Sequence, residues 1–353
     1  MFHSDNNNEV AMSKRYNKPI PYGWYAVEYS DKLENSQVVP LSYFGRELVL
    51  FRTESGKASL IDAYCPHLGA HLGHGGIVKG ESVSCPFHAW EFDGEGMCTN
   101  VPYAKRMPPK VKDKQSIRRY QVVERNQMIW AWYHPQDIEP LFEVDVVPEI
   151  GAEGWSPVDS YEWEIPTILQ ETGENAADLA HFVTVHGRPT VPDGEVILEG
   201  HRRSTIFDSE ANKVQGDGSV KHGSQQFESQ RLESYSIGPG QTYQRFSRMF
   251  EIVMMATIIP IDDQSLKLRF HFTLPDGQDG MQAAYAKGFR DEVVHQVEQD
   301  IPIWVHKKYL DTPILCDGDG PIGQYRKWFQ QFYAEDPVSN DERVKKDELI
   351  ASV

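Results

Sequence analysis

Two short cysteine–histidine motifs constrain this sequence more than any other feature. The first is CPH at residues 65–67, and the second is CPFH at residues 85–88, with seventeen residues between them. Each motif offers one thiolate and one imidazole. Two such turns facing each other could bind tetrahedral zinc, or a [2Fe–2S] cluster with both cysteines on one iron and both histidines on the other. The candidate ligands are Cys65, His67, Cys85 and His88.

Three features favour the iron–sulfur cluster over zinc. Zinc fingers usually pair Cys with Cys and His with His, whereas each motif here carries one of each. The motifs also lie in a segment that is rich in predicted strands. Five glycines between residues 69 and 80 would let backbone N–H groups approach the bridging sulfides, and such hydrogen bonds raise the reduction potential. His71 and His74 fit no ligand position and are interpreted as loop or surface residues.

The length of 353 residues exceeds what one ordinary core covers and indicates two domains. Residues 20–135 alternate β-branched and aromatic runs with glycine-containing turns, which predicts a small all-β domain. In residues 136–353, long alternating strands accompany helices predicted at about 164–184 and 281–309. This mixture favours an α+β domain with an antiparallel sheet and segregated helices.

The remaining segments are polar or acidic. Residues 1–19 are predicted to form a loose N-terminal arm, and the acidic, proline-containing residues 136–155 a linker or lid. Four cysteines are too few for a disulfide scaffold. Their pairing with histidine points to metal in a reducing compartment. Cys98 and Cys316 have no such neighbours and are predicted to be small buried apolar residues.

The formal net charge of -17 makes nucleic acid an improbable partner, because phosphate binding needs a basic surface. An acidic surface could steer a basic patch on a redox partner, although solubility alone also explains the charge. The sequence has neither a run of about 20 apolar residues nor the apolar run of a secretory signal. We therefore expect a soluble cytoplasmic protein without a membrane span.

A second candidate metal site lies in the segment NAADLAHFVTVH at residues 175–186. Two histidines and one carboxylate form the facial triad of mononuclear Fe(II) oxygenases, which leaves positions open for O₂. On one continuous helix His181 and His186 would point about 140° apart, since each residue turns about 100°. The helix is therefore expected to end before Gly187. Asp178 is better placed to hydrogen-bond the back of His181 than to bind the metal.

The run AYCPHLGAHLGHGGIVKGESVSCPFHAWEFDGEG resembles the Rieske domains of ring-hydroxylating and steroid oxygenases. The runs EQDIPIWVHKKY, LDTPILCDGDGP and GQYRKWFQQFY resemble the oxygenase component of the 3-ketosteroid 9α-hydroxylases. The runs YCPHLGAHLGHGG and CPFHAWEF also look like the cholesterol 7-desaturase branch of the same group. Together the resemblance covers about residues 20–335. It implies a Rieske non-haem iron oxygenase with a helix-grip (START-like) catalytic domain.

This resemblance also implies roles for individual residues. The iron ligands would be His181, His186 and a carboxylate in a late helix, for which Asp300 is the best candidate and Glu298 and Asp291 are competitors. Pro302 could distort that helix locally. Asp178 would relay an electron between subunits, and Asn175 would lie near the iron without binding it.

The expected enzyme is the terminal oxygenase of a multicomponent monooxygenase in steroid metabolism. It would use O₂ and electrons from NAD(P)H, delivered by a separate flavin and iron–sulfur reductase, to hydroxylate a 3-ketosteroid or sterol. The family arrangement implies a head-to-tail homotrimer in which His88 of one subunit meets Asp178 of the next. Residues 187–240 should line the substrate pocket, and half of the segment containing Val253, Met254, Met255, Ala256 and Ile258 should face it.

Three alternatives remain open at the level of sequence. The first keeps the chemistry and changes the substrate, giving desaturation or oxidative demethylation of another polycyclic, aromatic or N- or O-methyl compound. The second is a Rieske electron carrier, with two irons per chain instead of three. A zinc protein is the third.

Overall fold

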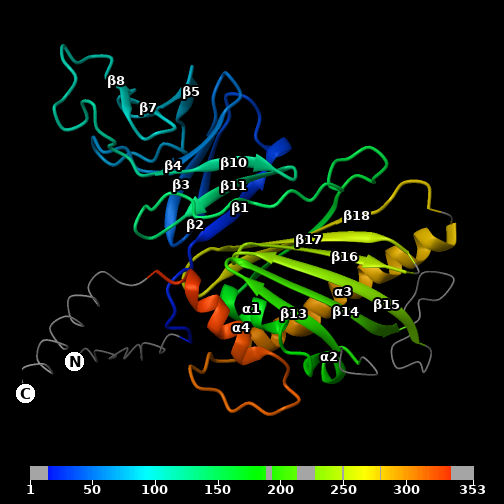
Figure 1. The fold of residues 1–353 in the computed structure, drawn as a ribbon. Coiled ribbons are helices and arrows are strands. Elements are labelled where there is room, and N and C mark those ends of the chain that lie inside the picture. The colour runs from blue at the N-terminus through cyan, green and yellow to red at the C-terminus, as the bar shows by residue number, and fades with distance from the viewer. Residues whose placement is uncertain (1–14, 188–192, 213–226, 249, 279, 335–353) are drawn as a thin grey trace, which may run out of the picture.

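The computed structural model describes residues 15–187, 193–212, 227–248, 250–278 and 280–334. An N-terminal β-domain lies against one face of a long sheet in the C-terminal domain, and helices α1, α3 and α4 lie on the opposite face (Figure 1). In this part of the chain no helix is long and apolar enough to cross a membrane. The predicted α+β fold class is confirmed.

The N-terminal domain consists of short antiparallel strands in three sheets of the described residues, ordered β1-β11-β10, β2-β3-β4-β9 and β5-β6-β7-β8. β11, with the sequence MIWAWY, is buried along its whole length because it lies between β1 and β10. The elements are β1 (Gly23–Tyr29), η1 (Ser30–Lys32), β2 (Val38–Tyr43), β3 (Arg46–Arg52), β4 (Ala58–Asp62), β5 (Ile77–Lys79), β6 (Ser82–Ser84), β7 (Glu91–Asp93), β8 (Cys98–Asn100), β9 (Arg119–Tyr120), β10 (Val122–Arg125) and β11 (Met128–Tyr133).

The C-terminal domain is built on one antiparallel sheet, ordered β12-β18-β17-β16-β15-β14-β13 in the described residues. β17 is buried on both faces because the helices cover one face and β1 packs against the other. The elements are β12 (Asp159–Ile165), α1 (Leu169–Asn175), α2 (His181–Thr184), β13 (Asp193–Glu199), β14 (Arg202–Asn212), β15 (Phe227–Ile237), β16 (Gln241–Ser247), β17 (Ile252–Pro260), β18 (Leu266–Thr273), α3 (Gly280–His306), α4 (Ile322–Phe329) and η2 (Gln330–Phe332).

One predicted helix is wrong and the other is close. The segment expected to be helical from 164 begins as the end of β12, because Glu164 and Ile165 pair with β18 and Pro166 follows. Two short helices, α1 and α2, then replace the single helix. The helix predicted at 281–309 is α3 at Gly280–His306, and it continues through Pro302.

The expected loose arm is corrected where the structure describes it, and of the expected linker or lid the structure favours the linker. Residues 1–14 lie outside the described residues. Tyr16, however, is buried, and its hydroxyl lies 3.1 Å from Thr167 Oγ1, so the end of the arm is packed. In the segment 136–155, Phe142 and Val144 are buried in the core, and the Phe142 carbonyl accepts a hydrogen bond from Trp24 Nε1 at 2.6 Å. This segment is therefore a packed connection and not a lid.

The two cysteines outside the motifs differ in how far they are buried. Cys98 is buried, as predicted, in the cluster of apolar residues beneath the two motif loops. Cys316 is exposed, so its predicted burial is wrong. It lies in the loop between α3 and α4, where its backbone N–H donates to Asp319 Oδ2 at 2.7 Å, and no core element covers it. Its thiol also donates to Asp319 Oδ1 at 3.4 Å, so the hydrogen bonds of a polar turn, and not burial, hold this residue.

Candidate metal centres

The two cysteine–histidine loops have the same backbone conformation. The Gly69 N–H donates to the Cys65 carbonyl at 2.9 Å, and the Ala89 N–H donates to the Cys85 carbonyl at 3.0 Å. Gly69 and Ala89 both have positive φ, 76° and 56°, which closes each turn. The two turns therefore place their cysteines at equivalent positions, whereas the histidines stand at successive positions, His67 two residues after Cys65 and His88 three residues after Cys85.

The side chains at the tips divide into buried sulfurs and partly exposed rings. Cys65 and Cys85 are buried, whereas His67 and His88 lie at the rim with their ring centroids 4.8 Å apart. Burial, with an added contribution from the Cys85 sulfur, raises the pKa of Cys65 to about 12. Two buried thiolates would thus need a bound cation to stabilise their charge.

The donor atoms of this set fit an iron–sulfur cluster. His88 Nδ1 is buried without a hydrogen-bond partner in the described structure, as expected of a nitrogen that binds a metal. The backbone N–H groups of His67 and Leu68 are directed at the Cys65 sulfur, where they stabilise a thiolate. Two cysteines and two histidines in this arrangement are the donor set of a Rieske [2Fe–2S] centre.

One histidine of the set is held by aromatic contacts that the sequence did not reveal. The His67 ring stacks on Trp90, with centroids 4.6 Å apart and planes 7° apart. Trp90 Nε1 in turn donates to the hydroxyl of Tyr103 at 2.8 Å, and Tyr103 is exposed. His71 and His74 instead contact each other, with ring centroids 4.4 Å apart and planes tilted by 41°, and Gly73 N–H donates to His71 Nδ1 at 3.0 Å.

The second histidine pair depends on a break in the helix. α2 begins at His181 and ends at Thr184, and His186 lies beyond it, followed by Gly187 with a φ of 64°. The chain thus turns His186 back, and the two rings come to 4.9 Å between centroids. This is the geometry that the spacing of the two histidines required.

Asp300 on α3 completes this group. One donor atom each from His181, His186 and Asp300 lies within 4.8 Å of the others, and His186 Nε2 is 3.4 Å from Asp300 Oδ1. All three side chains are at least nine-tenths buried. The competing carboxylates of Glu298 and Asp291 point outward, where they contact His295 and Arg290.

The charges of this group fit a bound cation. Asp300 is buried beside two imidazoles, and within the described residues no lysine or arginine forms an ion pair with it. A buried carboxylate without a cation is costly. Burial lowers the pKa of His181, so its ring is favoured in the neutral form that binds metal. Two imidazoles and one carboxylate suit ferrous iron with open positions.

Residues around the triad hold it in place. Asn175 Nδ2 donates to Asp300 Oδ2 at 2.8 Å and lies 3.2 Å from His181 Nε2. Gln299 Oε1 lies 3.0 Å from His186 Nδ1, an interaction that the sequence did not indicate. A histidine that binds metal commonly donates its other N–H in this way, which fixes the ring.

Asp178 contacts His181 differently from the expectation. Its backbone carbonyl, and not its carboxylate, is the group near His181 Nδ1. The carboxylate lies 4.0 Å from that atom and accepts the His181 backbone N–H at 3.3 Å. The reason is that residues 176–180 are not helical, so Asp178 and His181 do not share one helical face. The Asp178 side chain stays about one-third exposed.

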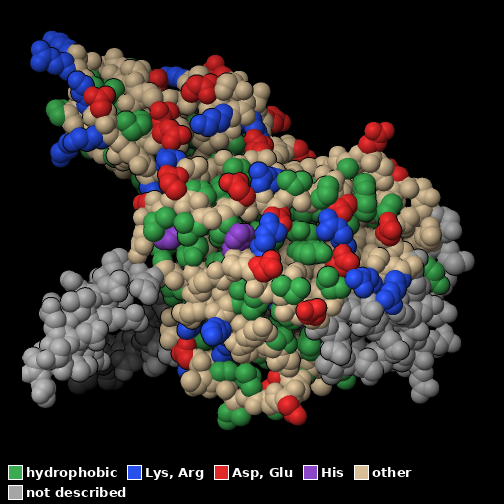
Figure 2. Space-filling model, in the orientation of Figure 1, with side chains coloured by type: hydrophobic (Ala, Val, Ile, Leu, Met, Phe, Trp, Pro, Cys, Tyr) green, Lys and Arg blue, Asp and Glu red, His purple; other side chains and the backbone are tan. Residues whose placement is uncertain are grey.

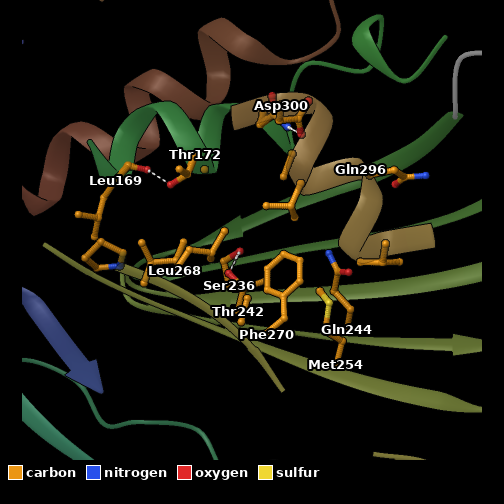
Figure 3. Close-up of a pocket in the computed structure, with 18 of the residues that line it drawn as sticks. Leu169, Thr172, Ser236, Thr242, Gln244, Met254, Leu268, Phe270, Gln296 and Asp300 are labelled. Carbon is orange, nitrogen blue, oxygen red and sulfur yellow. Dashed lines mark hydrogen bonds between the residues drawn. The ribbon is translucent and has the colours of Figure 1, made fainter. Parts of the chain in front are cut away.

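A large apolar cavity opens beside the triad, between α3 and the sheet (Figure 3). Its space is about 1180 Å³ when the open solvent at its mouth is included. Met254, Ala256 and Ile258 line it, whereas Met255 faces the other side of the sheet, so the predicted alternation of β17 is confirmed. Of the segment 187–240, the described lining residues are Leu232, Ser236, Gly238 and Pro239.

Comparisons with known proteins agree with both halves of this description. The Rieske [2Fe–2S] domain family matches residues 23–121, and the 3-ketosteroid 9α-hydroxylase C-terminal domain family matches residues 131–333. The chain is similar to a cholesterol 7-desaturase of Caenorhabditis elegans, with 33% identity over 94% of this chain and 80% of that protein. It is also similar to a 3-ketosteroid-9-alpha-monooxygenase oxygenase component of Rhodococcus rhodochrous, with 32% identity over 89% of this chain and 84% of that protein.

Among solved structures, dicamba monooxygenase bound to dicamba has the same fold, with a TM-score of 0.64 over 88% of this chain and 96% of that one, at 16% identity. The two family matches together cover most of the chain and include both candidate metal centres. The predicted resemblance is thereby confirmed, along with a Rieske cluster, non-haem iron and O₂ as the cofactors. The chain belongs to the Rieske non-haem iron oxygenases, in the group with a 3-ketosteroid 9α-hydroxylase catalytic domain.

Proposed function

We propose that this enzyme oxidises an unactivated C–H bond of a steroid or sterol in the cytoplasm. The observation that carries the proposal is the apolar cavity whose lining includes Asp300 of the triad, because a buried apolar wall beside an iron site suits a hydrocarbon skeleton. Two relatives support the substrate class: one is named for cholesterol and one for 3-ketosteroids.

The ligand assignment is part of this proposal. Cys65, His67, Cys85 and His88 would hold the cluster in a domain of residues 20–135, and His181, His186 and Asp300 would hold the iron in a domain of residues 136–353. When bound, the two metal centres supply stored electrons and O₂ activation. The chain itself excludes water from the cavity with its apolar walls, and it holds the iron ligands through Asn175 and Gln299.

A head-to-tail homotrimer would connect the two centres. β5, β7 and β8, which lie in the same domain as the cluster loops, are at one end of the folded molecule, and α2 is at the opposite end (Figure 1). This separation favours electron transfer between neighbouring subunits over transfer within one chain. In such a trimer His88 of one subunit would meet the partly exposed Asp178 of the next, from which the Asp178 carbonyl leads to His181. A separate reductase would supply the electrons from NAD(P)H.

Product analysis tests the substrate class. The purified chain, loaded with iron and supplied with NAD(P)H and a reductase, would be incubated with 3-ketosteroids, sterols and small aromatics, and the products analysed by mass spectrometry. A mass gain of one oxygen indicates hydroxylation, and a loss of two hydrogens indicates desaturation. Oxidation of the small aromatics alone would refute the steroid proposal.

Counting irons tests the ligand assignment separately. We expect three irons per chain, two of them in the cluster, and two irons in a His181→Ala variant that keeps its visible absorption. His295→Ala, a change at an exposed histidine of α3, is the matched control and should keep three. Two irons in the unmodified chain would instead favour an electron carrier.

A further inference from the structure

One short surface segment has a charge opposite to that of the chain. Residues 105–114, KRMPPKVKDK, contain five cations and one aspartate, a net charge of +4 in a chain of net charge -17. The five cationic residues, Lys105, Arg106, Lys110, Lys112 and Lys114, are all exposed. Within the described part of the chain, none of them forms an ion pair with a carboxylate. The segment is thus an unneutralised basic patch, and we call residues 105–114 the basic segment.

The basic segment is held in a fixed shape. Val111, between Lys110 and Lys112, is buried in the core beneath the cluster loops, together with Val101 and Ile117 on either side of the segment. The Val111 and Lys112 N–H groups both donate to the Pro108 carbonyl at 3.0 Å. The lysines therefore project from an anchored turn, and holding them together costs little further ordering on binding.

The segment begins beside the cluster. Tyr103, two residues before Lys105, accepts the hydrogen bond from Trp90, whose ring stacks on His67. Tyr103 is also near the second histidine of the cluster site, with its ring centroid 6.3 Å from that of His88. Figure 2 shows Lys and Arg side chains gathered at the free end of the N-terminal domain. The basic patch and the exposed edge of the cluster site thus belong to one surface.

We propose that the basic segment is the docking site for the acidic face of an iron–sulfur protein that donates electrons to the cluster. A chain of net charge -17 repels an acidic protein over most of its surface, so such a partner is steered to the place where the sign reverses. One electron passes from the reduced iron–sulfur group of the donor to the cluster, and no bond changes. This inference rests on the proposed function, since an electron donor is needed only if the cluster is reduced from outside.

Charge reversal in the intact holoenzyme tests the docking site. The triple variant Lys110→Glu, Lys112→Glu and Lys114→Glu changes exposed residues and leaves Val111 in place. The matched control is Lys287→Glu, Lys308→Glu and Lys327→Glu, three lysines of the C-terminal domain with the same change in charge. The probe is a strongly acidic plant-type [2Fe–2S] ferredoxin, whose Kd is measured by calorimetry at low salt and again near 0.5 M NaCl.

We expect the segment variant to weaken ferredoxin binding at low salt by about tenfold or more, and the control by much less. The difference should shrink at high salt, because the Debye length falls below about 5 Å. Equal losses in both variants would mean that only net charge matters and would overturn the proposal. So would a failure of the unmodified enzyme to bind at low salt.

Two further readouts distinguish docking of the ferredoxin from self-association and from damage to the cluster. If the mass of the segment variant in solution falls to that of a smaller assembly, the segment binds a second copy of this chain, and the docking proposal is wrong. Cluster reduction by dithionite, followed by visible absorption without steroid, should be the same in both variants. A failure of the steroid proposal would change the products formed and leave these binding constants unaffected.

Discussion

Asn175, the last residue of α1, donates a hydrogen bond to Asp300 on α3, with 2.8 Å between Asn175 Nδ2 and Asp300 Oδ2. The bond joins two helices across the candidate iron site and uses one of the two carboxylate oxygens, which leaves Oδ1 facing His186. The position of the carboxylate therefore depends on a neutral amide that itself need not bind the metal.

Removing this amide should weaken iron binding. Asn175→Ala leaves Asp300 without its donor and free to rotate, so we expect a loss of about 10- to 100-fold in iron affinity. Competition with a chelator, followed by iron counting, measures it. Glu298→Ala, an exposed change on the same helix as Asp300, is the control. Unchanged affinity in Asn175→Ala would show that the bond does not position the ligand.

Gln299 should hold the ring of His186 in the orientation that binds iron. Because its Oε1 lies 3.0 Å from His186 Nδ1, Gln299→Leu removes the acceptor that fixes the ring while keeping a side chain of similar size. We expect weaker iron binding of the same order and no change in the visible absorption of the cluster. Gln299→Glu keeps an acceptor and should retain tight binding. Equal losses in both variants would argue against a role in orienting His186.

Asp178 should affect turnover and not metal content. Its carboxylate accepts the His181 backbone N–H and is not one of the three candidate iron ligands, so Asp178→Ala should keep three irons per chain. The proposed link to His88 of a neighbouring subunit would be lost, and we expect steady-state turnover to fall by at least about tenfold, equal to about 1.4 kcal/mol of barrier. Rapid-mixing measurements would locate the delay after cluster reduction. Wild-type turnover in this variant would exclude the relay.

Gly173 in α1 has no room for a side chain. A Cβ there would lie 2.1 Å from the hydroxyl oxygen of Tyr325, which lines the apolar cavity beside the triad. Gly173→Ala should therefore lower the free energy of unfolding by about 1–3 kcal/mol, despite the better helix propensity of alanine. Adding Tyr325→Phe removes the clashing atom and should restore much of the loss. Strictly additive effects in this cycle would disprove the contact.

His271 should make stability depend on pH. It is buried between Ser160 and Thr257, and burial, together with the nearby charge of Arg269, lowers its pKa to about 3. The unfolded chain binds this proton near pH 6.5. The contribution of neutral His271 to the free energy of unfolding is thus fully present above about pH 6.5, and it is lost as the pH falls toward 3.

The variant His271→Gln removes this titration. The difference in the free energy of unfolding between the unmodified chain and the variant should shrink by about 1.4 kcal/mol per pH unit between pH 6 and pH 4. Urea unfolding at several pH values measures it. A difference that stays constant with pH would mean that His271 does not contribute in this way.

The sequence alone determined the parts of this protein that depend on neighbouring residues. Two cysteine–histidine motifs and the pair His181 and His186 are local, because a few residues of backbone fix how close their side chains can come. The alternation along β17 is local for the same reason, since successive side chains of a strand point to opposite faces. Asp300 was identified through family resemblance and not through spacing, because it lies over a hundred residues away from His186.

Only the tertiary structure decided which side chains from distant parts of the sequence contact each other. Helix and strand propensities compete within 164–184, and pairing of Ile165 with β18 settled the competition in favour of a strand end. Gln299 could be matched to His186, and Trp90 to His67, only after distant segments had packed together. The basic segment is recognisable in the sequence as a cluster of lysine and arginine residues. Its position beside the cluster loops is set by Val111, which is buried in the core beneath those loops. Long-range packing sets these relationships, and no local pattern encodes them.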